Sequence, residues 1–220
     1  MKLSVAVKKE ITKDWSGCFP ELGVYKPLWL LRRFGPLACG ICLNRDSGND
    51  AYCPTFHVHN LAKPSSVVTL TLADPLRTVK TGVPETIRAM FHQQRFADAA
   101  KRLNSQATIP LSGSVHLKDC LNAYRDYMHR PLGRYPLTLF EDIVTLFVWC
   151  NQTANAEEAL GDYEKAVNEW PKNAQPEIGV DAWVRQCRFW IENPDEVHSR
   201  VTSQAEFLQL QALPHSGLLS

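Results

Sequence analysis

The chain has 220 residues, of which 45% are hydrophobic, and its formal net charge at pH 7 is +1. This composition excludes a disordered, collagenous or fibrous chain and a strongly basic nucleic-acid binder of the histone kind. The charges are unevenly distributed, because residues 1–135 hold 19 basic and 10 acidic residues and residues 136–220 hold 5 basic and 13 acidic ones. The small net charge is therefore a cancellation between a basic part and an acidic part.

The location expected from the sequence is the cytoplasm, without a membrane partner. The longest apolar stretch, Ile143 to Cys150, is far shorter than a membrane span. Met1–Val7 is followed at once by charged residues, which does not fit a secretory signal. The chain has seven cysteines, an odd number, and several lie in apolar runs, as buried free thiols of a reducing compartment do.

The first residues carry two patterns. Alternating apolar and polar residues over Leu3–Val7 predict an edge strand. Val7, Ile11 and Trp15, at positions i, i+4 and i+8, predict instead a helix over Lys8–Trp15. A strand that leads into a short helix would satisfy both patterns.

Four short extended runs follow, each bounded by Gly, Pro, Asn or Asp. Runs separated by such turn residues are typical of an antiparallel meander. The predicted strands are Pro27–Arg33, Leu37–Leu43, Tyr52–His59 and Val67–Leu72.

From Pro84 onward the spacing of apolar residues becomes helical. Pro84 suits a first helical position ahead of an apolar stripe that begins at Ile87, and Ser114 suits the N-cap of the next helix. Three capping-box pairs predict further helix starts, and an amphipathic helix covers Val180–Ile191. The pairs are Thr138 with Glu141, Asn155 with Glu158, and Asn193 with Glu196.

We therefore predict an α+β fold, in which an antiparallel β-meander of about four strands is covered and followed by a helical bundle. The expected organisation is a β-rich basic half over residues 1–80 and a helical half over residues 81–213, acidic from residue 136 onward, within one compact unit. Residues 214–220 contain Pro, His, Ser and Gly and are expected to fray.

The segment Phe56-His57-Val58-His59-Asn60 is the most specific chemical feature. Residues i and i+2 of a strand share a face, so His57, His59 and Cys53 are expected side by side. Adjacent imidazoles can begin a site for zinc or another divalent metal, so a metal-dependent hydrolase is the alternative function. The same alternation describes an ordinary half-buried strand, which is the preferred interpretation.

The segment Cys39-Gly40-Ile41-Cys42 has the spacing of redox and zinc motifs. In a thioredoxin-like site the first cysteine begins a helix, whereas this motif lies in a predicted strand, which places the two cysteines on opposite faces. Cys53 and His57 would complete the spacing of a zinc knuckle, but the apolar context favours core thiols. No nucleophile, phosphate-loop or dinucleotide motif is present, so no catalytic residue is predicted.

Two pairs of basic residues flank aromatic residues in the first part of the chain. They are Lys8 with Lys9 and Arg32 with Arg33. Such a patch can meet phosphates, which makes nucleic-acid binding through the basic half a third hypothesis. A solvated face, or pairing with the acidic half, would explain the same residues.

Acidic residues gather on the predicted C-terminal helices. Some are first-turn acids favoured by the helix dipole, and the rest leave a surface that can attract a basic protein partner. We expect a non-catalytic protein-interaction module without a cofactor, of the kind represented by bacterial immunity or antitoxin-like proteins and accessory proteins of defence systems. The candidate partner-binding residues are Glu157, Glu158, Asp162, Glu164 and Glu169.

Overall fold

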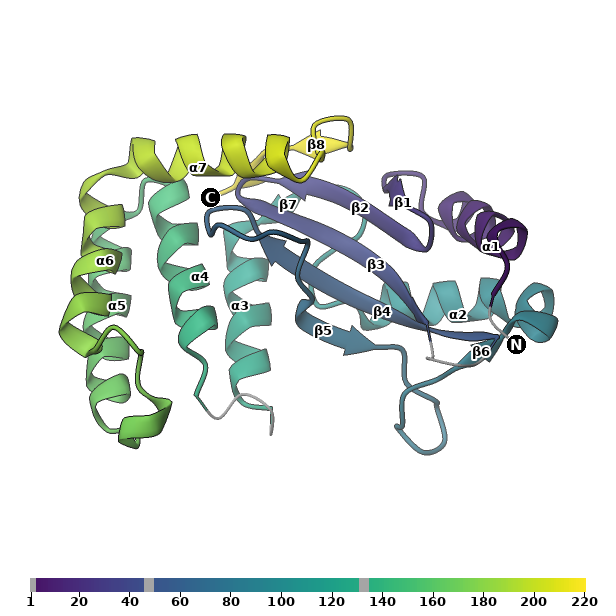
Figure 1. Ribbon diagram of the computed structural model, residues 1–220, viewed down its shortest axis with the longest axis horizontal. Coiled ribbons are helices and arrows are strands. Elements are labelled where there is room, and N and C mark those ends of the chain that lie inside the picture. The colour runs from purple at the N-terminus through teal and green to yellow at the C-terminus, as the bar shows by residue number, and fades with distance from the viewer. Residues whose placement is uncertain (1–2, 46–49, 131–134) are drawn as a thin grey trace.

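The computed structural model describes residues 3–45, 50–130 and 135–220 of the chain. An antiparallel sheet occupies one side of the molecule and helices form the other, with further helices behind the sheet (Figure 1). The predicted α+β class, with a sheet on the N-terminal side and a helical C-terminal part, is confirmed. One continuous cluster of buried apolar side chains includes residues of the sheet and of every α-helix in the described chain.

Five antiparallel strands form the main sheet, and each pairs with its neighbours in sequence. They are β1 (Gly23–Lys26), β2 (Trp29–Phe34), β3 (Leu37–Arg45), β4 (Ala51–Asn60) and β5 (Thr71–Pro75). Two shorter strands extend this sheet: β6 (Ile87–Arg88) pairs with β4, and β8 (His215–Ser216) runs parallel to β2.

Three of the four predicted strands correspond to β2, β3 and β4 within a few residues. The prediction of a strand at Val67–Leu72 was wrong in position, because β5 begins only at Thr71. Residues 61–70 instead cross one face of the sheet, where the backbone and hydroxyl of Thr69 contact His59. Strand β1 has no counterpart in the prediction, since its residues alternate between half-buried and exposed and form no apolar run.

The N-terminal segment forms a helix, α1 (Val5–Cys18), and the alternative edge strand is absent from the described part of that segment. The side chain of Ser4 accepts a hydrogen bond from the Val7 N–H, which satisfies one of the free amides of the first turn. Ile11 and Trp15 are buried, as the helical spacing predicts. The helical pattern therefore prevails over the alternating one.

The remaining helices cover the sheet and build the C-terminal side of the molecule. They are α2 (His92–Gln106), α3 (Leu117–Met128), α4 (Leu137–Trp149), α5 (Thr153–Asn168), α6 (Val180–Glu192) and α7 (Pro194–Phe207). Helix α4 contacts α3, α5, α6 and α7. It is buried on almost every side, which explains the near-continuous apolar run that includes Ile143.

Two predicted helix starts were wrong. Pro84 does not open a helix, because the next residues bond to the sheet: Ile87 pairs with Tyr52, and a 3₁₀ turn, Ala89–Phe91, precedes α2. Ser114 does not cap α3, because a short strand, β7 (Val115–His116), separates the two. In both places the backbone pairs with a distant strand, so the helix start that the local sequence predicts does not form.

The predicted capping boxes do not form. Helix α4 begins at Leu137 and α5 at Thr153, so Thr138 and Asn155 already lie within the helices. Asn193 does precede α7, with Pro194 at its first turn, but the Asn193 side chain donates to the Phe189 carbonyl instead of capping α7. Each side chain that was expected to cap therefore makes no cap hydrogen bond.

Residues 214–220 are ordered against the fold, so the expectation that they fray was wrong. The Arg33 N–H donates to the Pro214 carbonyl at 2.8 Å, and β8 continues this contact along β2. Strand β9 (Leu218–Leu219) then runs parallel to β7. The tail is held because it supplies backbone partners to two segments far away in the sequence.

Candidate functional site

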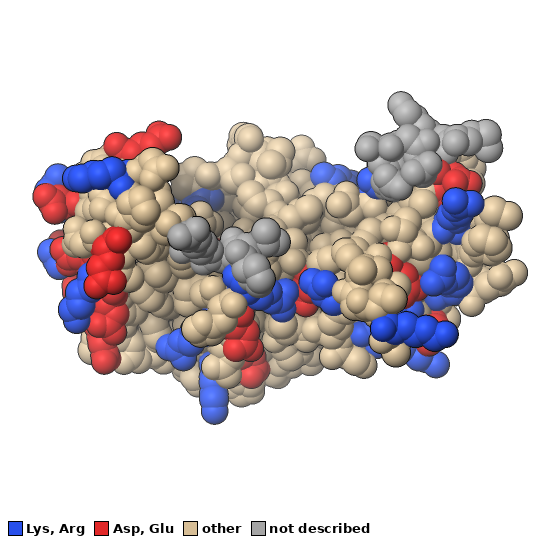
Figure 2. Space-filling view, turned by 90° about the horizontal axis from the view of Figure 1, so that it is seen from below, with Lys and Arg blue, Asp and Glu red and all other residues tan. Residues whose placement is uncertain are grey.

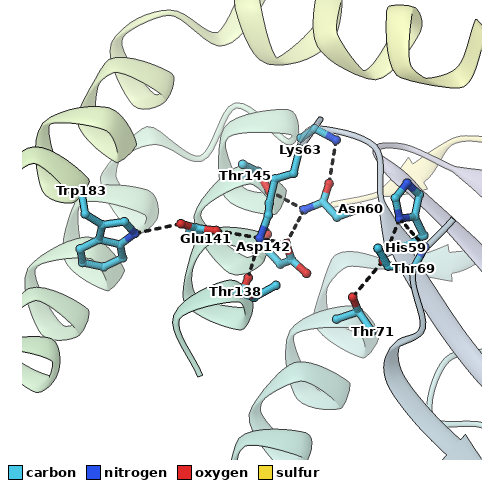
Figure 3. Close-up of polar contacts among 11 residues, drawn as sticks. His59, Asn60, Lys63, Thr69, Thr71, Thr138, Glu141, Asp142, Thr145 and Trp183 are labelled. Atoms are coloured by element: carbon cyan, nitrogen blue, oxygen red, sulfur yellow. Dashed lines mark hydrogen bonds and ion pairs between the residues drawn. The ribbon is translucent and has the colours of Figure 1, made fainter. Parts of the chain in front are cut away.

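His57 and His59 share one face of β4, and both side chains are buried. The imidazole of His57 meets the indole of Trp29 edge-on, with ring centroids 5.0 Å apart. Nδ1 of His59 lies 3.2 Å from the Thr69 backbone nitrogen and 2.9 Å from its hydroxyl oxygen (Figure 3). Because the backbone N–H can only donate, Nδ1 is the acceptor and the His59 ring proton lies on Nε2.

Both imidazoles are kept neutral by their surroundings. Burial lowers the pKa of His57 to about 3 and the pKa of His59 to about 4. Both ring nitrogens of His57, and Nε2 of His59, lack a hydrogen-bond partner of good geometry among the described residues. The pair is thus an incompletely bonded polar group inside an apolar core.

The third donor that a metal site requires is not beside this pair. Cys53 is only half-buried, and its thiol makes a single long contact with the Pro54 carbonyl. In residues 3–45, 50–130 and 135–220, no three His, Cys, Asp or Glu side chains are arranged to hold a metal ion. The described side chains therefore do not fit the catalytic zinc site that the sequence allowed.

The cysteines behave as core thiols. Cys39 and Cys42 lie on opposite faces of β3, as their spacing predicts, and all seven cysteines are free. Burial raises the pKa of the Cys42 thiol to about 12 and also raises the pKa of Cys39. Neither thiol forms a thiolate near neutral pH, so the pair does not fit a redox centre.

A buried chain of polar side chains joins α1, β4 and α2. Asp14 Oδ2 lies 3.0 Å from His92 Nε2, and His92 Nδ1 lies 2.7 Å from the Tyr52 hydroxyl. Trp15 Nε1 donates to the same hydroxyl at 3.2 Å. The Asp14 carboxylate can only accept, so Nε2 of His92 donates to it, and in the neutral imidazole Nδ1 accepts from the Tyr52 hydroxyl. Tyr52 and His92 are buried and only Asp14 is partly exposed, so the main effect of this chain is to lock three elements together.

A second buried network joins the sheet to α4. Lys63 Nζ lies 2.7 Å from Glu141 Oε2 and 3.4 Å from Asp142 Oδ1 (Figure 3). Asn60, the last residue of β4, donates to Asp142 at 3.0 Å and to Thr145 at 2.8 Å. Burial raises the pKa of Asp142, while Lys63 beside it acts in the opposite direction. The alternating pattern of β4 gives no sign of this network, because its partners are about 80 residues away.

The predicted acidic surface is divided between different sides of α5. Glu158 and Asp162 line a groove between α5 and α3. Glu157 approaches Arg188 of α6 instead, at 3.9 Å. Glu164 is half-buried and Glu169 is exposed, and neither lines the groove. The structure thus brings two of the five candidate residues together.

The four basic candidates do not form one patch. Arg32 is buried and bonds to Glu21, the Gly113 carbonyl and Ser216, so its guanidinium is already satisfied. Arg33 lies on the opposite face of the sheet, where burial lowers its pKa. Lys8 and Lys9 lie on α1, away from both. This geometry gives no common surface for a nucleic-acid backbone.

Charged side chains of both signs are spread over the surface of the molecule (Figure 2). Figure 2 shows acidic and basic side chains interspersed, both at the end formed by α5 and α6 and over the middle and the other end. Among the ion pairs of the described residues, only those of Lys63 join residues 1–135 to residues 136–220. The two charge excesses are therefore mostly presented outward.

No protein-family model, no curated protein and no solved structure matches the chain. Within the ranges that the structure describes, none of the helices combines the length and the apolar character needed to cross a membrane.

Proposed function

We propose that the chain is a non-catalytic, cytoplasmic protein-interaction module, and that the groove between α3 and α5 receives its partner. An immunity-like, antitoxin-like or defence-accessory role belongs to this proposal, since such proteins act by occupying a partner. The observation that carries it is the groove itself, which combines an apolar floor with two rims of opposite charge. The seven free cysteines support a reducing compartment.

The groove has a volume of about 640 Å³. Its floor is apolar and is contributed by three helices, with Leu117 and Leu121 from α3, Phe147 from α4 and Ala159 from α5. Apolar surface of this kind gains free energy when a partner removes it from water. Leu117, Leu121 and Phe147 are themselves almost fully covered, so most of the apolar surface that a partner would remove from water belongs to the half-buried Met128, Ala159 and Tyr163.

The charged residues on the two rims of the groove determine the orientation in which a partner binds. Glu158 and Asp162 stand on the α5 side, and Lys118 and Arg125 stand on the α3 side. The best match is an amphipathic helix that lays its apolar face on the floor, with basic side chains toward α5 and acidic ones toward α3. A helix inserted in the reverse direction or rotated about its axis would place like charges together.

Charge reversal within the groove tests the proposal. The variant Glu158→Lys/Asp162→Lys should lose a partner that the wild-type chain captures from cells of its own source, because both reversed charges face that partner. Glu157→Lys, on the α6 side of the same helix, is the matched control and should keep the partner. With the purified partner, association of the double variant should be at least about tenfold slower at low salt.

Two results would contradict this placement. One is retention of the same partner by Glu158→Lys/Asp162→Lys with unchanged kinetics. The other is a particular pattern of photo-crosslinking. In this pattern a crosslinker at Ala159 does not label the partner, whereas a crosslinker at an exposed residue of another helix does.

A further inference from the structure

A second hollow lies at the other end of the molecule, between the start of α1 and the adjoining ends of β2 and β3. Its volume is about 480 Å³, within the range of small-molecule sites. Apolar walls are provided by Trp29 and Leu70, among others, and three cations line it: Lys8, Lys26 and Arg45. It shares no residue with the groove between α3 and α5.

The charge of this hollow is one-sided. None of the described residues that line it is acidic, and Lys8, Lys26 and Arg45 form no ion pair with any described residue. Three cations that have no ion-pair partner among the described residues repel one another around this cavity, and an anion that enters relieves this repulsion. The hollow is therefore electrostatically suited to a negatively charged ligand.

Helix α1 turns its acidic side chains away from the hollow and a basic one toward it. Its acids Glu10 and Asp14 both accept hydrogen bonds from Gln93 of α2, so they face away from the hollow. Lys8 lies on the side that lines the hollow. Val5, the first residue of the helix, also lines it, which brings the positive end of the helix dipole close.

The cavity wall also positions a flat apolar surface beside the cations. Lys26 is exposed, and its Nζ lies 4.3 Å from the centre of the Trp29 ring, so the ammonium covers the indole at the edge of the cavity. Trp29 is half-buried and is fixed from behind by the ring of His57. A planar ring that contacts Trp29 therefore has to displace the Lys26 ammonium, which is then free to pair with the anionic group of the same ligand.

We propose that this hollow binds an organic phosphate of mononucleotide size, with the phosphate among Lys8, Lys26 and Arg45 and the ring against Trp29 and Leu70. The ligand is either a free nucleotide or the end of a single-stranded nucleic acid, which present the same phosphate and base. This site differs from the basic patch expected from the sequence, because Lys26 and Arg45 take the places of Arg32 and Arg33.

The test measures binding of AMP, ATP, inorganic phosphate and an oligothymidine of eight nucleotides to the full chain by calorimetry. Saturable binding of a nucleotide or of the oligonucleotide is expected, and which of them binds more tightly identifies the source. Lys26→Gln and Arg45→Gln should each weaken binding, raising the dissociation constant by at least about tenfold. Lys165→Gln, on the remote helix α5, is the matched control and should leave it unchanged.

A second readout is the indole N–H signal of Trp29 in the NMR spectrum, assigned with Trp29→Phe. This signal should shift on addition of the ligand, whereas binding at another basic surface would leave it in place. The proposal is overturned if none of the nucleotide probes binds, if Lys165→Gln weakens binding as much as Lys26→Gln, or if the Trp29 signal does not respond. Thermal unfolding of each variant confirms that the fold is intact.

Discussion

Gly40 occupies a position on β3 where the sheet has no room for a side chain. A Cβ atom added there would collide with the carbonyl oxygen of Leu30 on the neighbouring strand. Backbone atoms cannot give way as a flexible side chain can, so the strand itself would have to move. The glycine of the Cys39–Cys42 segment is therefore explained by packing.

We expect Gly40→Ala to lower the free energy of unfolding by about 3 kcal/mol, the upper end of the usual cost of overpacking, measured by urea denaturation. Gly161→Ala in α5 is the matched control, because nothing lies within 4 Å of the added Cβ atom. A helical glycine exposes backbone and loses entropy on folding, so this second variant should gain up to about 1 kcal/mol. Equal effects of the two substitutions would contradict the packing argument.

His57 makes the stability of the protein sensitive to acid. Its pKa in the folded chain, about 3, lies below the ordinary value of 6.5, so the unfolded chain binds a proton first as the pH falls. Stability is thus complete above about pH 6.5 and decreases toward the folded pKa, by about 1.4 kcal/mol for each pH unit for this group. His59, with a folded pKa of about 4, adds a loss of the same sign.

His57→Leu should reduce this acid sensitivity while leaving stability at pH 7.5 equal or higher, because both ring nitrogens lack partners and a leucine leaves none unsatisfied. Urea denaturation at pH 7.5 and pH 5 measures both effects. The exposed His116→Gln is the control and should retain the wild-type difference between the two pH values. A large loss of stability at pH 7.5 in His57→Leu would show that His57 has a structural or ligand-binding role.

At the scale of whole elements, two buried polar chains connect segments that are far apart in sequence. Asp14, His92 and Tyr52 join α1 and α2 to β4. Lys63, with its partners on α4, joins the end of the sheet to the helical part. Apolar packing alone tolerates sliding, whereas directional hydrogen bonds fix how these elements meet.

Lys63→Met should lower the free energy of unfolding by about 3 to 5 kcal/mol, since it leaves the buried carboxylate of Asp142 without its cation. Lys63→Met/Asp142→Asn removes both charges and keeps a side chain that can accept from Asn60, so it should recover part of the loss. A double-mutant cycle in urea gives the coupling between the two residues. A loss below about 1 kcal/mol in the single variant would show that the pair contributes little.

At the scale of the molecule, the near-zero net charge conceals a basic excess over residues 1–135 and an acidic excess over residues 136–220. The two candidate binding sites differ in charge: the groove between α3 and α5 has one acidic and one basic rim, and the hollow beside α1 is lined by three cations. Because these charges face solvent, both proposed interactions should weaken as salt rises. The two sites are independent, so loss of one interaction should leave the other intact.

The sequence alone determined the α+β class, the central strands β2 to β4, and the helices α6 and α4, since each depends on a local apolar pattern. It did not determine the helix starts at Pro84 and Ser114 or the ordered tail, because there the backbone pairs with residues far away in sequence. The sites were decided by tertiary structure for the same reason. Glu158 and Arg125 line one groove only after the chain has folded. The same holds for Lys8, Lys26 and Arg45, which line one hollow.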